Sequence, residues 1–144
     1  MNPWNKAKLS IEFETESVHG KTMHLCILYN NQIVQKSCAM SEGVSTWCHE
    51  IELPTTITLI TSGRGPASTI VDSNNNIVKN MSIKIKNIFL DGLPTWDNWY
   101  EEAIITECDD SDEILIGSTI CANATVALEF KEHNVFKWIV KTKS

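Results

Sequence analysis

The sequence of 144 residues has the length of one domain that can bury a core without disulfides or metals, and we expect a single domain over 1–144. Its 42% hydrophobic and 21% charged residues are ordinary for a globular fold. The formal net charge of −6 argues against nucleic-acid binding, because neutralising phosphates needs clustered Lys and Arg. The sequence has no apolar run that could span a bilayer and no signal peptide at its start. We therefore expect no membrane association and synthesis in a cytoplasm without secretion.

The five cysteines are Cys26, Cys38, Cys48, Cys108 and Cys121, an odd number at wide spacings without a C-x-x-C pair. This pattern predicts unpaired thiols, and apolar neighbours place Cys26 and Cys121 among the buried residues. The wide spacing also argues against a zinc site, since zinc ligands normally come in close pairs.

The first half of the chain alternates apolar and polar residues with a period of two, which predicts half-buried strands. In 10–16, for example, three glutamates alternate with Ile11, Phe13 and Thr15. Asn30-Asn31 separates two such runs and predicts a tight hairpin, because Asn tolerates positive φ. The predicted strands of this half are 10–16, 24–29, 32–35, 46–53 and 57–61.

The middle of the chain predicts a hairpin between two strands. The runs 68–71 and 77–80 flank the Asx-rich residues 72–76, which we interpret as a hairpin tip in solvent. A calcium loop of the EF-hand type does not fit, because Ile77 stands where that loop needs Gly. Arg64 lies between two glycines, as in a phosphate loop, but no helix follows it. We therefore expect an exposed loop at Arg64.

The second half contains the one segment that favours a helical turn, near 95–102. Trp96, Trp99 and Tyr100 would then lie on one side of the turn. Flat rings suit a sugar face or the apolar anchor of a partner protein, so these three residues are a candidate binding surface. The alternative is that they cap one end of the core. Further strands are predicted in 83–90, from 104 onward, and in 114–118, 125–131 and 135–143.

Eight to ten short strands with turns at regular spacing predict an all-β fold. The sequence shows no long helical period, no internal repeat and no low-complexity linker. Two antiparallel sheets packed as a jelly-roll-like sandwich fit this pattern best.

The segment between Asn87 and Phe130 contains no Lys or Arg, so part of the surface should be strongly acidic. Asp109, Asp110 and Asp112 form its densest acidic run. Together with Asp91 they are candidate calcium ligands gathered from separate strands, and calcium is the one cofactor that the sequence suggests. The alternative is solvated charge, which is the commoner state of such runs.

No motif in the sequence indicates catalysis. The four histidines are scattered, and the neighbouring Glu101 and Glu102 would point apart rather than face each other as glycosidase acids do. We therefore expect no catalytic residues and no enzymatic activity. A small enzyme on a jelly-roll scaffold is the weakest hypothesis, because the sequence offers no cluster of His and carboxylate ligands.

A series of features in fixed order fills 57–92. They are the strand 57–61, a Gly-rich loop, Thr69, Val71-Asp72, the Asn-rich hairpin, Ile83-x-Ile85 and Leu90-Asp91-Gly92. This order resembles the small β-sandwich domains of tailed-bacteriophage structural proteins, and it is similar to the jelly-roll of calcium-dependent xylan-binding modules. In those families an acidic residue precedes the threonine, whereas Ser68 stands there in this chain. The resemblance therefore does not carry a calcium site over to these residues.

Two hypotheses about function follow. The first is a non-enzymatic virion structural protein of a bacteriophage, a decoration, cement, connector or tail accessory subunit. The resemblance implies this role, a location in the virion, and other virion proteins as partners in a homo- or hetero-oligomeric assembly. The alternative is a carbohydrate-binding module that holds a glycan on Trp96, Trp99 or Tyr100, with calcium assisting.

Overall fold

The computed structural model describes residues 5–65, 68–94, 103–108, 115–116, 119–120 and 123–130. These residues form β-strands joined by turns, and the predicted helical turn near 95–102 lies outside them. No helix in the described part is long and apolar enough to cross a membrane. The strands are β1 (Lys6–Glu16), β2 (His24–Tyr29), β3 (Gln32–Ala39), β4 (Gly43–Glu52), β5 (Thr55–Ser62), β6 (Thr69–Val71), β7 (Ile77–Asn80), β8 (Ser82–Leu90), β9 (Leu93–Pro94), β10 (Ala103–Cys108), β11 (Leu115–Ile116), β12 (Thr119–Ile120) and β13 (Ala124–Phe130).

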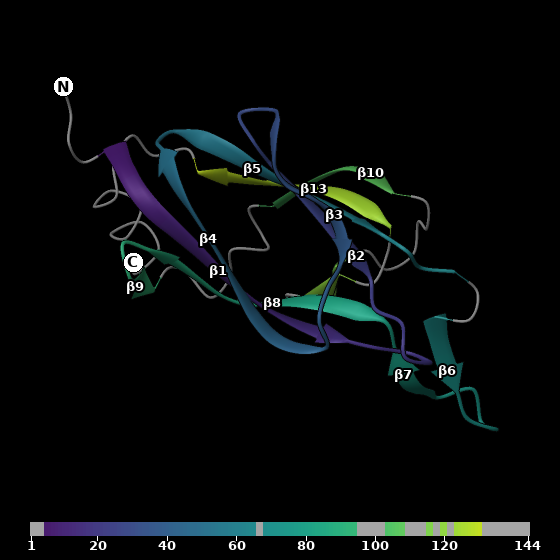
Figure 1. Cartoon of the computed structure of the whole chain (residues 1–144). Helices are drawn as coiled ribbons and strands as arrows, with labels where there is room; N and C mark the ends of the chain where they lie inside the picture. The colour runs from purple at the N-terminus through teal and green to yellow at the C-terminus, as the bar shows by residue number, and fades with distance from the viewer. Residues whose placement is uncertain are drawn as a thin grey trace.

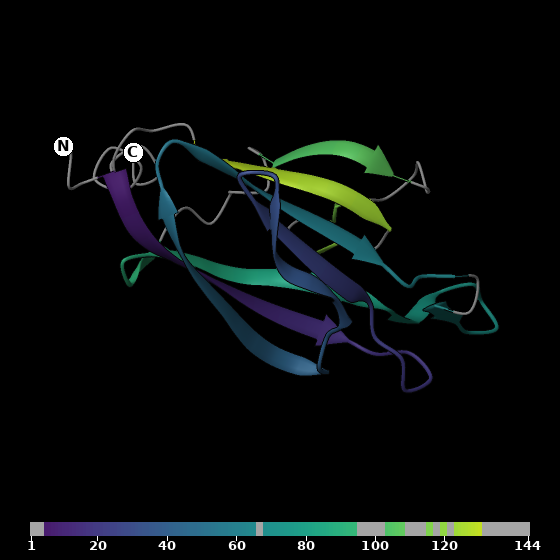
Figure 2. The same ribbon diagram turned by 45° about the horizontal axis from the view of Figure 1, so that its top comes forward.

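The strands form two antiparallel sheets and one separate hairpin. The first sheet has the order β11-β12-β8-β1-β4 with β9 beside β8, and the second has the order β10-β13-β5-β2-β3. Figures 1 and 2 show the two sheets facing each other, with the β6–β7 hairpin projecting at one end. The connections from β1 to β2, from β3 to β4 and from β4 to β5 each cross to the facing sheet. The predicted all-β sandwich of antiparallel strands is confirmed.

β1 organises the first sheet, because it pairs with β4 on one side and with β8 on the other. Its apolar residues Leu9, Ile11 and Phe13 are buried, while the alternate residues Ser10, Glu12 and Glu14 face outward. This alternation confirms the predicted strand. β1 begins at Lys6, before the predicted start, because Ala7 is buried and continues the same inward row.

Inward side chains of both sheets meet in one hydrophobic core. In the second sheet, β5 contributes Ile57 and Leu59, and β13 contributes Val126 and Leu128, all of them buried. Leu59 lies opposite Val126 on one side and opposite Ile27 of β2 on the other. The alternation that predicted these strands therefore also identified the residues that hold the sheets together.

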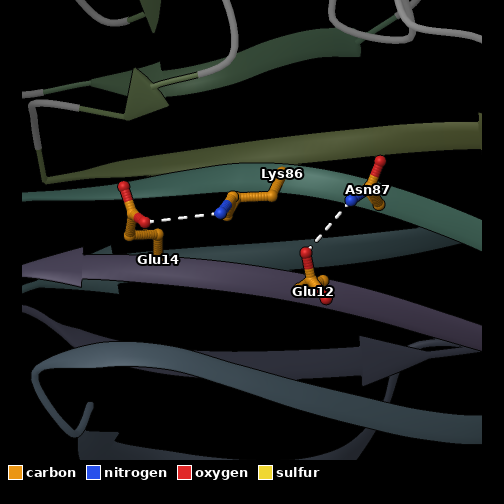
Figure 3. A network of polar contacts seen from close by, with 4 residues as sticks. All are labelled: Glu12, Glu14, Lys86 and Asn87. Atoms are coloured by element: carbon orange, nitrogen blue, oxygen red, sulfur yellow. Dashed lines mark hydrogen bonds and ion pairs between the residues drawn. The ribbon is translucent and has the colours of Figure 1, made fainter.

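A β-bulge in β8 keeps one face of this strand in the core. The β1–β8 register shifts where Lys86 and Asn87 both face solvent, and the extra residue returns Ile88 to the core. Figure 3 shows that the two outward side chains reach β1. Lys86 Nζ lies 3.5 Å from a carboxylate oxygen of Glu14. Asn87 Nδ2 donates a 3.0 Å hydrogen bond to Glu12 Oε1.

The β2–β3 hairpin turns at Asn30 and Asn31, which adopt φ values of 51° and 61°. A two-residue hairpin turn of this type needs positive φ at both central positions, and Asn tolerates that conformation better than most residues. The predicted hairpin is confirmed.

One carboxylate organises the tip of the β6–β7 hairpin. Asp72 Oδ1 accepts hydrogen bonds from the backbone N–H groups of Asn74 at 2.8 Å and Asn76 at 3.0 Å. The tip residues are exposed, which confirms the predicted hairpin with its tip in solvent. The backbone hydrogen bonds from Asn76 and Asn74 favour the ionised carboxyl and lower the pKa of Asp72.

Arg64 differs from the prediction of an exposed loop, because its side chain is half-buried. Its guanidinium donates to Asn80 Oδ1 at 2.7 Å, to Thr69 Oγ1 at 3.0 Å and to the carbonyl oxygen of Met81. Its backbone N–H donates at 2.9 Å to Asn123 Oδ1, and Asn123 Nδ2 donates back to its carbonyl at 3.1 Å. Arg64 therefore binds the base of the hairpin to the body of the sandwich.

Truncating the core should destabilise the fold far more than truncating the surface. We expect Leu59→Ala to lower the free energy of unfolding by about 2–5 kcal/mol, because Leu59 is fully buried between two strands. Val44→Ala is the control, since Val44 is 57% exposed, and it should stay within about 0.5 kcal/mol of the unmodified protein. Urea unfolding measures both, and equal losses would contradict the described core.

Protonation of Asp72 at acidic pH should weaken the hydrogen bonds at the tip of the β6–β7 hairpin. The lowered pKa of Asp72 means that its contribution to tip stability is present above the ordinary carboxyl value of 3.8 and is lost as pH falls through the lower folded value. We expect the NMR amide shifts of Asn74 and Asn76 to move in that acidic range. Asp72→Asn keeps the acceptor oxygen without the charge, so its tip amides should not titrate. A midpoint at or above 3.8 in the unmodified protein would contradict the described hydrogen bonds.

Candidate functional site

Among the described strands, β3 and β4 are the terminal strands of the two sheets. These strands are consecutive in the chain, and residues 40–42 cross from one sheet to the other between them. The two sheet edges are therefore joined on the same side of the molecule. A gap between inward-facing side chains can form there without interrupting either sheet.

The inward side chains of β4 are only half-buried at this side. Ser45, Trp47 and His49 are partly exposed, whereas their partners in β1 are buried. β3 covers them incompletely, because its pairing with β2 contains two register shifts and bulges twist an edge strand away from its neighbours. Ile51, further along the same face, is buried again.

Three rings form a connected row along this face. The rings of Trp47 and His49 are stacked, with centroids 5.8 Å apart and planes 9° from parallel. Tyr29 meets His49 edge to face, with centroids 5.3 Å apart. The Tyr29 hydroxyl accepts a 2.9 Å hydrogen bond from the backbone N–H of Glu52, which anchors the row at one end. The Trp47 ring is therefore held in place by its neighbours before any ligand arrives.

A groove of about 220 Å³ meets the Trp47 ring. His49 stacks on one face of this ring and is not among the described residues that line the groove. We name this feature the Trp47 groove. The described residues that line it are Phe13, Gln35, Cys38, Ala39, Met40, Ser41, Ser45, Thr46 and Trp47.

Hydrogen bonds fix the polypeptide around the Trp47 groove. Gln35 Nε2 donates to the carbonyl oxygen of Leu25 at 3.2 Å, which orients the amide at the groove wall. The backbone N–H of Met40 donates to the carbonyl oxygen of Met23 at 3.0 Å. The hydroxyl of Thr22 donates to the carbonyl oxygen of Met40. The connection between β3 and β4 is thereby tied to the segment that leads into β2.

A larger groove of about 400 Å³ lies at the paired ends of β1 and β4 and is bordered by charged side chains. Lys6 lies opposite Glu52, and Lys8 lies opposite Glu50, in the β1–β4 register. Opposite charges directly across two strands attract each other and stabilise the pair. Each lysine of this groove therefore faces a glutamate across the sheet, and no aromatic residue of the described part lines the groove.

Asp91, predicted as a metal ligand, connects the turn after β8 to β1. Its Oδ1 accepts a 2.8 Å hydrogen bond from the backbone N–H of Lys8, and its own N–H donates to the Lys8 carbonyl at 2.9 Å. The other predicted ligands, Asp109, Asp110 and Asp112, lie outside the described residues, so the metal site stays a prediction. Within the described part, no three His, Cys, Asp or Glu side chains gather around a point that could hold a metal.

The predicted aromatic surface, Trp96, Trp99 and Tyr100, also lies outside the described residues and stays a prediction. Trp47 and His49 lie in the strand predicted over 46–53, on its inward face, but the sequence pattern did not identify them as a site. Their spacing of two residues was the available signal, because it aligns two rings on one face. Only the position of β4 at a sheet edge turns that face toward solvent, and edge position is a property of the whole fold.

The thiols of the described part agree with the prediction of unpaired cysteines. Cys26 is buried and free, and Cys38 and Cys48 are exposed and free. Cys38 lines the Trp47 groove, whereas Cys48 belongs to the outward row of β4, with its Sγ 3.3 Å from the Ser10 hydroxyl. The predicted burial of Cys121 lies outside the described residues.

No model of a known protein family and no curated protein matches the sequence. The fold, however, is similar to that of solved structures. A structure of vCBM60 in complex with galactobiose has a TM-score of 0.52 at 9% identity, covering 85% of this chain and 97% of that chain. A selenomethionine form of vCBM60, described with two families of calcium-dependent carbohydrate-binding modules linked by circular permutation, has a TM-score of 0.49 at 6% identity, covering 90% and 98%. At such low identity the likeness shows the fold alone, an all-β sandwich like that of a carbohydrate-binding module.

Proposed function

We propose that this chain is a non-catalytic carbohydrate-binding module and that the Trp47 groove is its sugar site. The observation that carries the proposal is the partly exposed Trp47, whose ring stacks on His49 and which lines a groove. The ring is already held in place before a ligand binds, so ordering the Trp47 side chain subtracts little from the free energy of binding.

The lining of the Trp47 groove has the two kinds of surface that a sugar ring needs. A sugar ring presents an apolar C–H face, which packs on an aromatic plane, and a rim of hydroxyls that donate and accept hydrogen bonds. Trp47 supplies the plane. The amide of Gln35 and the hydroxyls of Ser41 and Ser45 supply polar groups near it.

The shared sandwich supports this proposal over a virion role, since vCBM60 was solved with galactobiose. The bacteriophage origin, virion location and assembly partners stay predictions without a structural observation in their favour. Mass spectrometry of purified virions tests them, and finding the protein there at high copy number would support them. Calcium stays a separate prediction that depends on Asp91, Asp109, Asp110 and Asp112.

Removal of the Trp47 ring should abolish most of the binding. A glycan array first identifies the bound sugars, and isothermal titration then measures their affinities. We expect Trp47→Ala to weaken binding about 10–100-fold, because truncating an aromatic anchor costs roughly 1.4–3 kcal/mol. Trp47→Phe keeps a smaller ring and should lose less.

Two variants serve as controls for Trp47→Ala. Val44→Ala changes the outward face of the same strand, so it should bind as the unmodified protein does. Trp96→Ala tests the surface predicted from sequence. Circular dichroism checks that both variants are folded. A loss of binding in Trp96→Ala but not in Trp47→Ala would show that the sugar site lies at the predicted aromatic surface and not at the Trp47 groove. An array without any bound glycan would overturn the proposed function.

A further inference from the structure

The described residues that line the Trp47 groove carry no formal charge. They are four apolar residues, one cysteine, one glutamine, two serines and one threonine. The groove differs in this respect from the one between β1 and β4, whose described lining includes two lysines and three carboxylates. Any charge on a ligand in the Trp47 groove would therefore lack a partner of opposite sign among these residues.

Four charged residues are adjacent in sequence to the lining, and none is part of it. Glu12 and Glu14 flank Phe13 on β1, where Glu12 accepts a hydrogen bond from Asn87 and Glu14 pairs with Lys86. Glu42 follows Ser41, and its Oε1 accepts a 2.8 Å hydrogen bond from the hydroxyl of Ser17, so this carboxylate is engaged elsewhere. Lys36 follows Gln35 on β3 and is exposed. An acidic sugar in the groove would thus gain no close ion pair from the described residues.

The polar groups of the groove match uncharged hydroxyls. Serine and threonine hydroxyls and the glutamine amide each donate and accept hydrogen bonds, as sugar hydroxyls do. A carboxylate or sulfate only accepts, and desolvating it without a cation is costly. The net charge of −6 adds a repulsion that acts on any anionic glycan as it approaches.

The volume of the Trp47 groove limits the size of what it can enclose. About 220 Å³ lies below the range of roughly 300–1,000 Å³ that is usual for pockets enclosing drug-sized ligands. A unit of the size of one sugar ring suits this space, and the rest of a glycan would extend beyond it.

We propose that the Trp47 groove selects one neutral sugar ring and binds it without a metal ion. This inference depends on the proposed function and goes further, because it names the class of sugar and excludes a bridging cation. Specificity would come from Trp47 together with Gln35 and Ser45, whose side chains offer stacking and hydrogen bonds but no charge.

The test uses an array that contains matched pairs of oligosaccharides, such as galactobiose and digalacturonate, which differ by a carboxylate on each ring. Binding is measured in calcium chloride and again in EDTA. We expect neutral members to bind at least tenfold more tightly than their acidic counterparts, and EDTA to change their affinity less than twofold. Gln35→Glu introduces a charge at nearly constant shape and should weaken binding of neutral sugars, while Val44→Ala should not.

The outcomes separate this inference from the proposed function. Failure to bind any glycan overturns both. Tight binding of acidic sugars, or binding that EDTA abolishes, overturns neutral and metal-free recognition but leaves a carbohydrate-binding module. Binding that Gln35→Glu and Trp47→Ala both leave intact would show that the sugar lies elsewhere, and it would also overturn the inference.

Discussion

The inner face of β4 is covered by the facing sheet at Ile51 but only partly at Trp47. This difference follows from the position of β4 at the end of its sheet and from the two register shifts in the pairing of β3, the terminal strand opposite. Packing on the other side of β4 is complete, because β1 pairs with it over ten consecutive residues without a shift. A rigid strand therefore presents part of its core face to solvent.

A groove of this kind costs the fold little stability. Interior strands carry the main core, with Leu9, Ile11 and Phe13 of β1 and Ile57 and Leu59 of β5 all buried. The rings of Trp47 and His49 are only partly covered by the facing sheet, and they gain packing contacts by stacking on each other. Tyr29 completes the row. Binding surfaces placed on well-supported strands keep their geometry better than surfaces placed on loops.

Local patterns in the sequence predicted much of the fold. The alternating residues of β1 and the two asparagines of the β2–β3 turn have conformations set by near neighbours, so the sequence was sufficient for them. The bulge in β8 is visible as two adjacent polar residues, Lys86 and Asn87, but its effect depends on the pairing with β1. Arg64 was misjudged because its partner Asn123 lies 59 residues away.

The candidate site was less predictable than the fold because it depends, like the contacts of Arg64, on segments that are far apart in the sequence. Trp47 and a fully buried tryptophan in a central strand would have the same local pattern, since both alternate with polar neighbours. Their difference is the number of neighbouring strands, which depends on how the whole chain pairs. The sequence pattern favoured Trp96, Trp99 and Tyr100 instead, because their clustering is visible in the sequence without knowledge of the fold.

Protection of a thiol at the Trp47 groove tests the location of the site most directly. Cys38 lines the groove and Cys48 lies in the outward row of β4, and both are exposed and free. Peptide mass spectrometry can follow iodoacetamide modification of each with and without a saturating bound glycan. Our account predicts that the glycan slows modification of Cys38 severalfold and leaves Cys48 unchanged. An unchanged rate at Cys38 while the glycan is bound would contradict it.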